Sequence, residues 1–187
     1  MFHDRVAKMS HRVVEGLWLA RPCDRPKTIP QTRARGAKAQ GLRYERGLAK
    51  ALSSWQHGQW FEFRDRNGPG YCQPDFIRLD SASVAVLECK YTWTPEGHSQ
   101  IEQLYRPILT MALALPVMGV VVCKVLRPGM PKDIAVVSGL ASALALAAVG
   151  QRVVWHWIGL GPLSAQPHLV PIDPASPGAH RAAMELL

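Results

Sequence analysis

The fold of this chain is decided by the stretch QPDFIRLDSASVAVLECKY, residues 73–91. Apolar positions on both sides of a small polar turn at Ser81-Ala82 predict two strands of one hairpin, over about 71–80 and 83–91. A two-residue turn sets the register, because each residue of the first strand then has one partner in the second. The residues that face each other can therefore be named from the sequence.

The predicted register brings charged side chains together. Counting outward from the turn places Asp75 opposite Glu88. The same count places Gln73 opposite Lys90. Because strand side chains alternate between faces, Glu88 and Lys90 share a face and Cys89 points away. Two carboxylates that face each other in a sheet repel, by roughly up to 1 kcal/mol. The patch is either a solvated polar face, with Lys90 screening Glu88, or a functional site.

A bound metal ion would resolve the repulsion between Asp75 and Glu88. Carboxylate oxygens are hard ligands, and Mg²⁺ is typically held by one or two of them with water and substrate phosphate. A lysine beside such a site, here Lys90, can position or deprotonate a water molecule or stabilise charge on a phosphate. The hairpin therefore predicts a Mg²⁺ site, at which Mn²⁺ can substitute.

Pro74-Asp75, followed by Glu88-x-Lys90 on a hydrophobic strand, resembles the motif of the PD-(D/E)xK nuclease superfamily, which has the restriction-endonuclease-like fold. The resemblance implies Mg²⁺-dependent hydrolysis of phosphodiester bonds, with an endonuclease favoured over an exonuclease. It implies that Asp75, Glu88 and the main-chain carbonyl of Cys89 are metal ligands. It also implies that Lys90 is the catalytic lysine.

A helix is predicted from about residue 38 to 55, with Leu48 and Leu52 on one face. Glu45 lies one turn before Leu48, where a lone acid is costly unless it has a partner. Nucleases of the superfamily often direct an acidic residue from the helix before the first strand at the metal site. The resemblance therefore implies that Glu45 is a further catalytic and metal-binding residue. The alternative is a surface glutamate paired with a neighbouring arginine.

The net charge of +8 indicates a polyanionic partner, and nucleic acid is the default expectation. Residues 21–41 combine six cations with three prolines and predict a flexible basic arm that contacts phosphates, with a solvated linker as the alternative. A basic stripe at helical spacing continues into the predicted helix. The nucleic-acid-binding candidates are Arg33, Arg35, Lys38, Arg43, Arg46 and Lys50.

A second helix is predicted from about residue 96 or 98 to residue 115, and Pro107 should kink or divide it. Several lineages of the superfamily carry a glutamine on the helix after the ExK strand, close to the active site. The helical face favours Gln100 for this role, whereas Gln103 is followed by leucine, as in the familiar Gln-Leu pair. Both stay candidates, and ordinary exposed glutamines are the alternative.

Four further elements complete the expected fold. A strand over 59–66 joins the hairpin as a meander, and a nearly continuous apolar strand over 117–126 is expected to be buried on both faces. An Ala/Leu helix over 133–150 and a last strand over 152–158 follow. This order matches the αβββαβ restriction-endonuclease-like core, a mixed central sheet flanked by helices, with a C-terminal αβ extension. The likeness covers about 40–126, and helical crossovers predict parallel late strands.

Three regions are expected along the chain. Residues 1–38 hold an N-terminal helix, predicted within 1–20, and the basic arm. Residues 39–160 form the nuclease-like α/β domain, and 161–187 form a proline-rich irregular tail. Four cysteines without CxxC spacing favour a reducing cytoplasm over a zinc site or disulfides. The uncharged run 134–150 is short for a membrane span, so a buried helix and no membrane partner are expected.

The sequence thus favours a Mg²⁺-dependent DNA nuclease. The alternative from another class is a non-catalytic nucleic-acid-binding module or a phage-type structural protein that retains the fold. A third hypothesis is a membrane-associated or partner-binding protein. DNA is the expected partner, and a homodimer or a specificity partner protein stays open. The choice between DNA and RNA and the structure of the substrate are open as well.

Overall fold

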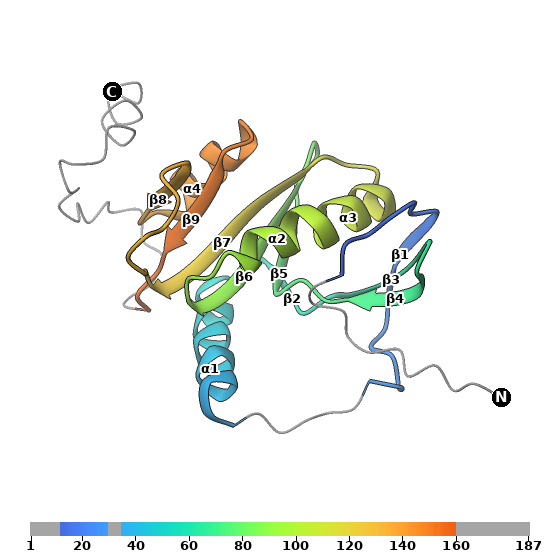
Figure 1. Ribbon diagram of the computed structural model, residues 1–187, viewed down its shortest axis with the longest axis horizontal. Coiled ribbons are helices and arrows are strands. Elements are labelled where there is room, and N and C mark those ends of the chain that lie inside the picture. Colours follow the sequence, from blue (N-terminus) through green and yellow to red (C-terminus); the bar gives the residue numbers. More distant parts are fainter. Residues whose placement is uncertain (1–11, 30–34, 160–187) are drawn as a thin grey trace.

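The computed structural model describes residues 12–29 and 35–159. They form a mixed α/β fold with a six-stranded central sheet, helices on both faces of that sheet, and a small three-stranded sheet at one side (Figure 1). The strands are β1 (Leu19–Cys23), β2 (Gln56–His57), β3 (Trp60–Asp65), β4 (Gly68–Cys72), β5 (Phe76–Leu79), β6 (Val84–Thr92), β7 (Val117–Val125), β8 (Ile134–Val137) and β9 (Arg152–His156). The helical elements are α1 (Gly36–Ala51), α2 (Glu96–Gln100), the π-helical turn η1 (Ile101–Tyr105), α3 (Arg106–Leu113) and α4 (Leu140–Ala148).

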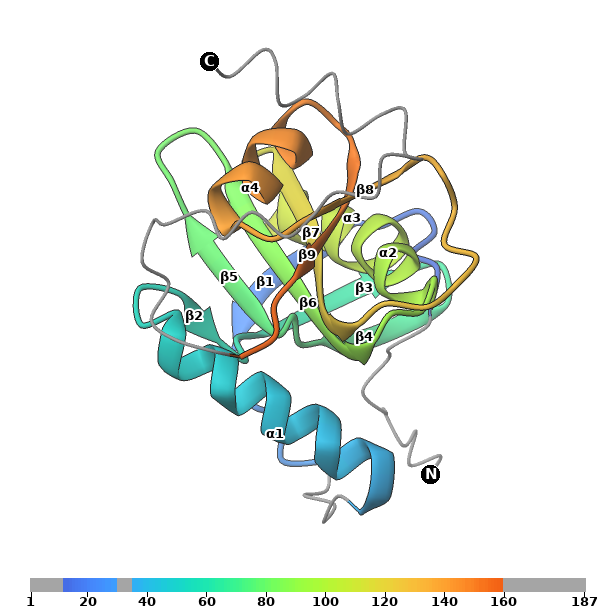
Figure 2. The same ribbon diagram turned by 90° about the vertical axis from the view of Figure 1, so that its left-hand side faces the viewer.

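The central sheet has the strand order β2-β5-β6-β7-β9-β8. Strand β5 runs antiparallel to β6, whereas β7, β9 and β8 continue parallel to β6. The prediction of parallel late strands is therefore confirmed. Helices α1 and α4 cover one face of the sheet, and the segment α2-η1-α3 covers the other (Figures 1 and 2). The central strands are thus buried on both sides, which explains the continuous apolar run of β7.

The hairpin register predicted from the sequence is confirmed. Phe76 pairs with Leu87, and Leu79 pairs with Val84. Beyond the ladder, the Asp80 amide donates a hydrogen bond to the Ser83 carbonyl at 2.9 Å. The turn therefore closes with two residues, as expected, and the ladder ends at Phe76 and Leu87, one residue before the predicted acidic pair Asp75 and Glu88.

The predicted single strand over 71–80 is wrong, because its residues are divided between β4 and β5. The predicted strand over 59–66 is β3 and pairs with β4 as expected, but β4 and β5 lie in different sheets, so the three-stranded meander does not form. The chain leaves β4 at Cys72, crosses from the small sheet to the central sheet, and enters β5 at Phe76. Pro74 lies at the crossing, and proline lacks the N–H that a strand position would donate. The predicted pairing of Gln73 with Lys90 consequently lies outside the β5–β6 ladder, which ends at Phe76.

Helix α1 confirms its predicted amphipathic pattern. Tyr44, Leu48 and Leu52 are buried against the central sheet. Arg43 and Lys50 lie on the exposed side. Burial of the three apolar side chains contributes roughly 2 kcal/mol each, so packing rather than intrinsic helix propensity holds this element in place.

The helical segment after β6 is interrupted where Pro107 predicted it. Because Pro107 has no N–H, the carbonyl of Gln103 lacks its usual helical donor four residues later, and it accepts a hydrogen bond from the Val14 amide at 3.1 Å instead. Just before this point the helix widens, and the Arg106 amide bonds back to the Ile101 carbonyl five residues earlier. The proline thus coincides with a π-turn.

Three other predictions need correction. The helix expected over 133–150 is strand β8 followed by α4, because three β-branched residues within 134–137 favour an edge strand. The N-terminal helix is wrong over its described part: residues 12–18 are irregular, Leu19–Cys23 pairs with β3, and Val14 packs on the core. The predicted flexible basic arm over 21–41 also needs correction, because residues 21–23 belong to strand β1. Residues 1–11, 30–34 and the tail 161–187 lie outside the described residues.

All four cysteines are free, and Cys72 and Cys123 are buried. Within residues 12–29 and 35–159, none of the helices combines the length and the apolarity that crossing a membrane requires.

Candidate active site

Asp75 and Glu88 directly follow the last pair of the β5–β6 ladder, Phe76 and Leu87, at the point where the two strands part. Asp75 is half-buried, and its Oδ2 accepts a hydrogen bond from the Cys89 amide at 2.7 Å. The predicted acidic pair is therefore held in place by the main chain of β6.

The alternation of hydrogen-bonded pairs along a β-ladder indicates which way the main-chain carbonyl of Cys89 points. Hydrogen-bonded pairs alternate along an antiparallel ladder, and the pair Asp80–Ser83 sets their phase. Extended two residues beyond the last pair, Phe76 and Leu87, this phase directs the Cys89 carbonyl toward Pro74, which has no N–H to donate. By this extrapolation the carbonyl faces the Asp75 side of β6, where a metal ligand would lie.

Glu88 is buried, with 3% of its surface exposed. Its Oε1 contacts the Nζ of Lys90 in an ion pair, while its Oε2 is buried without a hydrogen-bond partner among the described residues. Leaving a buried acceptor unsatisfied costs roughly 1–3 kcal/mol, and more when the group is charged. A cation beside Oε2 would offset this cost.

Lys90 is held by a chain of side chains from the helical segment that covers this face of the sheet. Its Nζ donates to the Oε1 of Gln100 at 2.6 Å. The Nε2 of Gln100 in turn donates to the Tyr105 hydroxyl at 3.3 Å, and that hydroxyl donates to the Gln73 carbonyl at 3.5 Å. The chain connects the lysine to the Gln73-Pro74-Asp75 crossing.

Tyr105 is a site residue that the sequence did not reveal, because it reads as one more member of an apolar helical stripe. It lies five residues after Gln100, and the π-turn between them brings the two side chains together. Burial raises the pKa of Tyr105 well above its usual range, and the charges of Glu88 and Asp75 raise it further. Its hydroxyl therefore stays protonated and able to donate.

The structure separates the two candidate glutamines. Gln100 is 5% exposed and contacts the Nζ of Lys90, whereas Gln103 is exposed and lies on the outer side of the π-turn. Gln100 is the glutamine that belongs to the candidate site.

The structure pairs Glu45 of α1 with His57, on the face of the sheet opposite the contact between Lys90 and Gln100. The Oε1 of Glu45 lies 2.7 Å from the Nε2 of His57, whose ring stacks on Phe76 at 4.8 Å between centroids. The partner that Glu45 required is therefore a histidine, which the sequence had not indicated. Desolvation raises the pKa of the Cys89 thiol, and three carboxylates raise it further. These carboxylates are Asp75, Glu88 and Glu45.

The donor set at the β5–β6 edge fits a hard dication. In the part of the chain that the structure describes, no three His, Cys, Asp or Glu side chains group as a metal site. Mg²⁺ does not require three, because one or two carboxylates with water and substrate oxygens commonly hold it. Asp75, Glu88 and the Cys89 carbonyl supply such a set, and the unpartnered Oε2 of Glu88 is the atom that would gain most from the ion.

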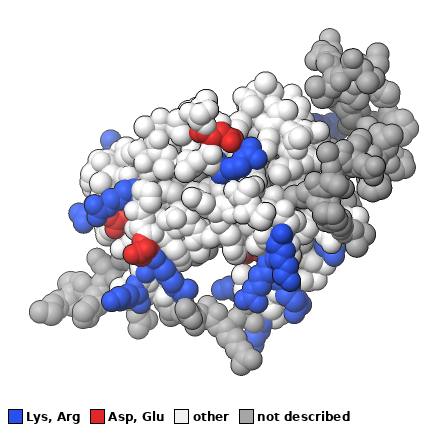
Figure 3. All heavy atoms as spheres, turned by 180° about the vertical axis from the view of Figure 1, so that it is seen from behind, with Lys and Arg blue, Asp and Glu red and all other residues white. Residues whose placement is uncertain are grey.

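The basic candidates that the structure describes lie on one element. Five of them are exposed along α1 and the residue before it, namely Arg35, Lys38, Arg43, Arg46 and Lys50. Figure 3 shows Lys and Arg side chains gathered over α1 at the lower edge of the face in view. Arg33 lies outside the described residues.

Neither a protein-family model, nor a curated protein, nor a solved structure matches this chain. The fold and the site by themselves define an α/β protein with a mixed central sheet and an acidic pair beside a lysine at one strand end.

His98 in α2 is a buried titratable group, and its burial predicts that the stability of the protein depends on pH. It is 4% exposed, and burial, with a smaller contribution from the charge of Arg152, lowers its pKa to about 4. The unfolded chain binds this proton near pH 6.5, so the native state loses stability as the pH falls from about 6.5 toward 4. The loss attributable to His98 is roughly 3 kcal/mol.

Urea unfolding of the wild type and of His98→Gln at pH 7, 5.5 and 4.5 measures this contribution. The difference between the two proteins should shrink as the pH falls, because the variant lacks the titrating ring. His156→Gln, at a half-buried histidine, is the matched control for the loss of an imidazole elsewhere in the fold. A His98→Gln curve that runs parallel to the wild type would contradict the prediction.

Proposed function

We propose that this chain is a Mg²⁺-dependent DNA nuclease that hydrolyses phosphodiester bonds, with endonucleolytic cutting favoured. One observation carries the proposal. Asp75 and Glu88 directly follow the last pair of the β5–β6 ladder, Glu88 contacts the Lys90 ammonium, and the buried Oε2 of Glu88 has no partner among the described residues. Paired acids at such a position are destabilising in a sheet that serves structure alone.

The arrangement of elements supports a restriction-endonuclease-like core. Helix α1 precedes the antiparallel hairpin β5–β6, and the segment α2-η1-α3 crosses over to β7, which is parallel to β6. The acidic pair and the lysine stand at the end of this hairpin. The region from β8 to β9 adds one further parallel unit, in place of the simple αβ extension expected.

Each residue of the site has a role in this proposal. Asp75, Glu88 and the Cys89 carbonyl would hold the ion, which when bound polarises the scissile phosphate and acidifies a water molecule. Lys90 orients that water or stabilises charge on the phosphate.

Three further side chains act around this centre. Gln100 fixes the Lys90 ammonium, and Tyr105 fixes Gln100. Glu45, held by His57 on the opposite face of the sheet, adds negative charge near Cys89. The exposed cations of α1 bind the phosphate backbone.

The test is cleavage of supercoiled plasmid, linear duplex, single-stranded and branched DNA, and of a matched RNA, with Mg²⁺, Mn²⁺ or EDTA. Wild-type protein should cut at least one DNA in the presence of either metal and none in EDTA. Glu88→Gln should cut none while retaining the wild-type circular dichroism spectrum. Salt-sensitive DNA binding without cutting of any substrate would overturn the proposal in favour of a non-catalytic nucleic-acid-binding module.

Tyr105→Phe should lower the cleavage rate by about tenfold, because Gln100 then loses a fixed partner and the Lys90 ammonium loses its orientation. The substitution keeps the buried ring, so stability should fall by only about 1 kcal/mol. Single-turnover cleavage rates measured across pH 6–9 distinguish a lost orientation of Lys90 from a changed protonation. If only the orientation is lost, the rate of Tyr105→Phe should fall by the same factor at every pH, and the shape of the pH–rate profile should not change. Tyr71→Phe, at a half-buried tyrosine of β4, is the control. Equal rates for both variants would remove Tyr105 from the site.

A further inference from the structure

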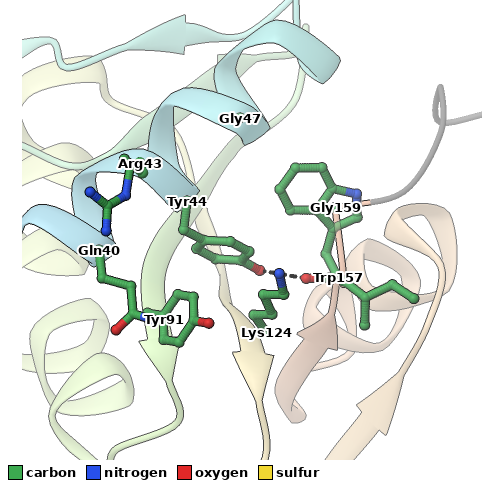
Figure 4. A pocket seen from close by; sticks show the side chains of 9 residues that line it. Gln40, Arg43, Tyr44, Gly47, Tyr91, Lys124, Trp157 and Gly159 are labelled. Carbon is green, nitrogen blue, oxygen red and sulfur yellow. Dashed lines mark hydrogen bonds between the residues drawn. The ribbon is translucent and has the colours of Figure 1, made fainter. Parts of the chain in front are cut away.

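A hollow of about 350 Å³ lies on the α1 face of the central sheet, near the end of β6 that carries Lys90 (Figure 4). It is formed by α1, the ends of β6 and β7, and the segment after β9, so four parts of the chain meet there. Its lining residues are Gln40, Arg43, Tyr44, Gly47, Tyr91, Lys124, Trp157, Ile158 and Gly159.

The lining combines aromatic rings with positive charge. Three of the nine lining residues are aromatic and two are cationic, and the lining contains no carboxylate. Lys124 places its Nζ 5.9 Å from the ring centroid of Tyr91, a cation–π arrangement. Such a surface suits a ligand with a flat ring and a negative charge.

The aromatic part of the hollow is rigid. Tyr44 donates a hydrogen bond to the Trp157 carbonyl at 2.9 Å, and the two rings lie 5.3 Å apart. Tyr91 packs edge-on against Tyr44 at 6.0 Å. The Lys124 carbonyl accepts a hydrogen bond from the His156 ring at 2.9 Å, which ties the lysine to β9. A ring that entered the hollow would meet side chains already held in place, at low entropic cost.

We infer that this hollow is a subsite for one unpaired nucleotide of a DNA strand, with Tyr91 and Trp157 against the base and Arg43 and Lys124 against a phosphate. The inference rests on the proposed nuclease function and narrows its substrate. A base inside a duplex is covered by its neighbours, so a stacking subsite selects single-stranded DNA or a strand with an unpaired base.

The position of the hollow relative to the candidate active site supports this assignment. Tyr91 directly follows Lys90 on β6, and the two side chains point to opposite faces of the sheet. A DNA strand that contacts both Lys90 and Tyr91 would therefore pass around this end of β6, from one face of the sheet to the other.

Binding of a fluorescein-labelled dT₁₂ strand, measured by anisotropy in EDTA, tests the subsite without cleavage. A strand of the same length made of abasic units is the second probe, and a twelve-base-pair duplex is the third. Wild-type protein should prefer dT₁₂ over the abasic strand by about tenfold, which corresponds to one stacked base. Tyr91→Leu should abolish this preference and leave duplex binding unchanged.

Lys124→Gln should weaken dT₁₂ and abasic binding equally, by several-fold, because it removes a phosphate contact and leaves the rings in place. Lys132→Gln, at an exposed lysine after β7, and Tyr71→Leu are the matched controls. Lys124 is exposed, so its variant tests the subsite even if Tyr91→Leu unfolds.

Equal affinity of the wild type for dT₁₂ and the abasic strand, or unchanged binding by Lys124→Gln, would overturn the subsite. Failure of the nuclease proposal looks different, because dT₁₂ binding would persist while no DNA is cut with Mg²⁺ or Mn²⁺.

Discussion

Lys90→Met is expected to abolish metal-dependent DNA cleavage, with the single-turnover rate reduced about 10³-fold or more. The variant keeps the length of the side chain but removes the ammonium that contacts both Glu88 and Gln100. General acid–base and charge-stabilising groups contribute about 10²–10⁴-fold to such reactions. The measurement is plasmid nicking with Mg²⁺ at saturating protein, so that weaker DNA binding does not enter the rate.

Lys132→Met is the control for loss of one positive charge, since Lys132 is exposed and distant in sequence from the site. It should cut at the wild-type rate. A Lys90→Met protein that folds and cuts within about tenfold of the wild type would show that the lysine is structural.

Lys90→Met should also lower the stability of the protein, because Glu88 is buried. Without the Lys90 ammonium the Glu88 carboxylate is left buried and unpaired, so the free energy of unfolding should fall by roughly 1–3 kcal/mol. This is less than the cost of breaking a fully buried ion pair, because the Lys90 side chain is partly exposed to solvent. Adding Glu88→Gln to Lys90→Met should recover part of that loss. Urea unfolding of the four proteins of this double-mutant cycle measures the coupling independently of any activity.

Gly119→Ala is expected to destabilise the protein by roughly 2–3 kcal/mol, which is large for the addition of one methyl group. Gly119 lies in β7, beneath the start of the π-turn. A Cβ at this position would overlap the Cγ2 of Ile101 and approach its Cβ to 3.3 Å. Ile101 is 1% exposed and β-branched, so it cannot rotate away without disturbing its own packing.

Gly41→Ala is the matched control, because Gly41 lies in α1 with no other atom within 4 Å of an added Cβ. It should stabilise the protein by about 0.5–1 kcal/mol through the higher helix propensity of alanine. Urea unfolding measures both variants. Ile101→Ala should restore part of the stability lost in Gly119→Ala; equal stability of Gly119→Ala and the wild type would contradict the predicted contact.

The Gly119 variant also connects packing to the candidate site. Ile101 directly follows Gln100, whose amide contacts Lys90. A shift of Ile101 away from β7 would move Gln100 as well, so cleavage by Gly119→Ala should fall even at temperatures where the protein stays folded.

The sequence by itself determined the local features of this protein. The register of β5 and β6 follows from a two-residue turn and from strand alternation, which are properties of neighbouring residues. The exposed cations and buried leucines of α1 follow from helical periodicity in the same way. The parallel direction of β7 follows from the helix that precedes it.

Only the tertiary structure decided which distant residues meet. Whether Tyr71 pairs with β3 or continues toward β6 depends on two competing sheets, and the crossing at Pro74 resolves it. The choice of Gln100 and the recruitment of Tyr105 depend on a π-turn, which breaks the regular spacing that sequence patterns rely on. The pair of Glu45 with His57 joins two elements that no local pattern connects, because packing rather than sequence spacing sets such contacts.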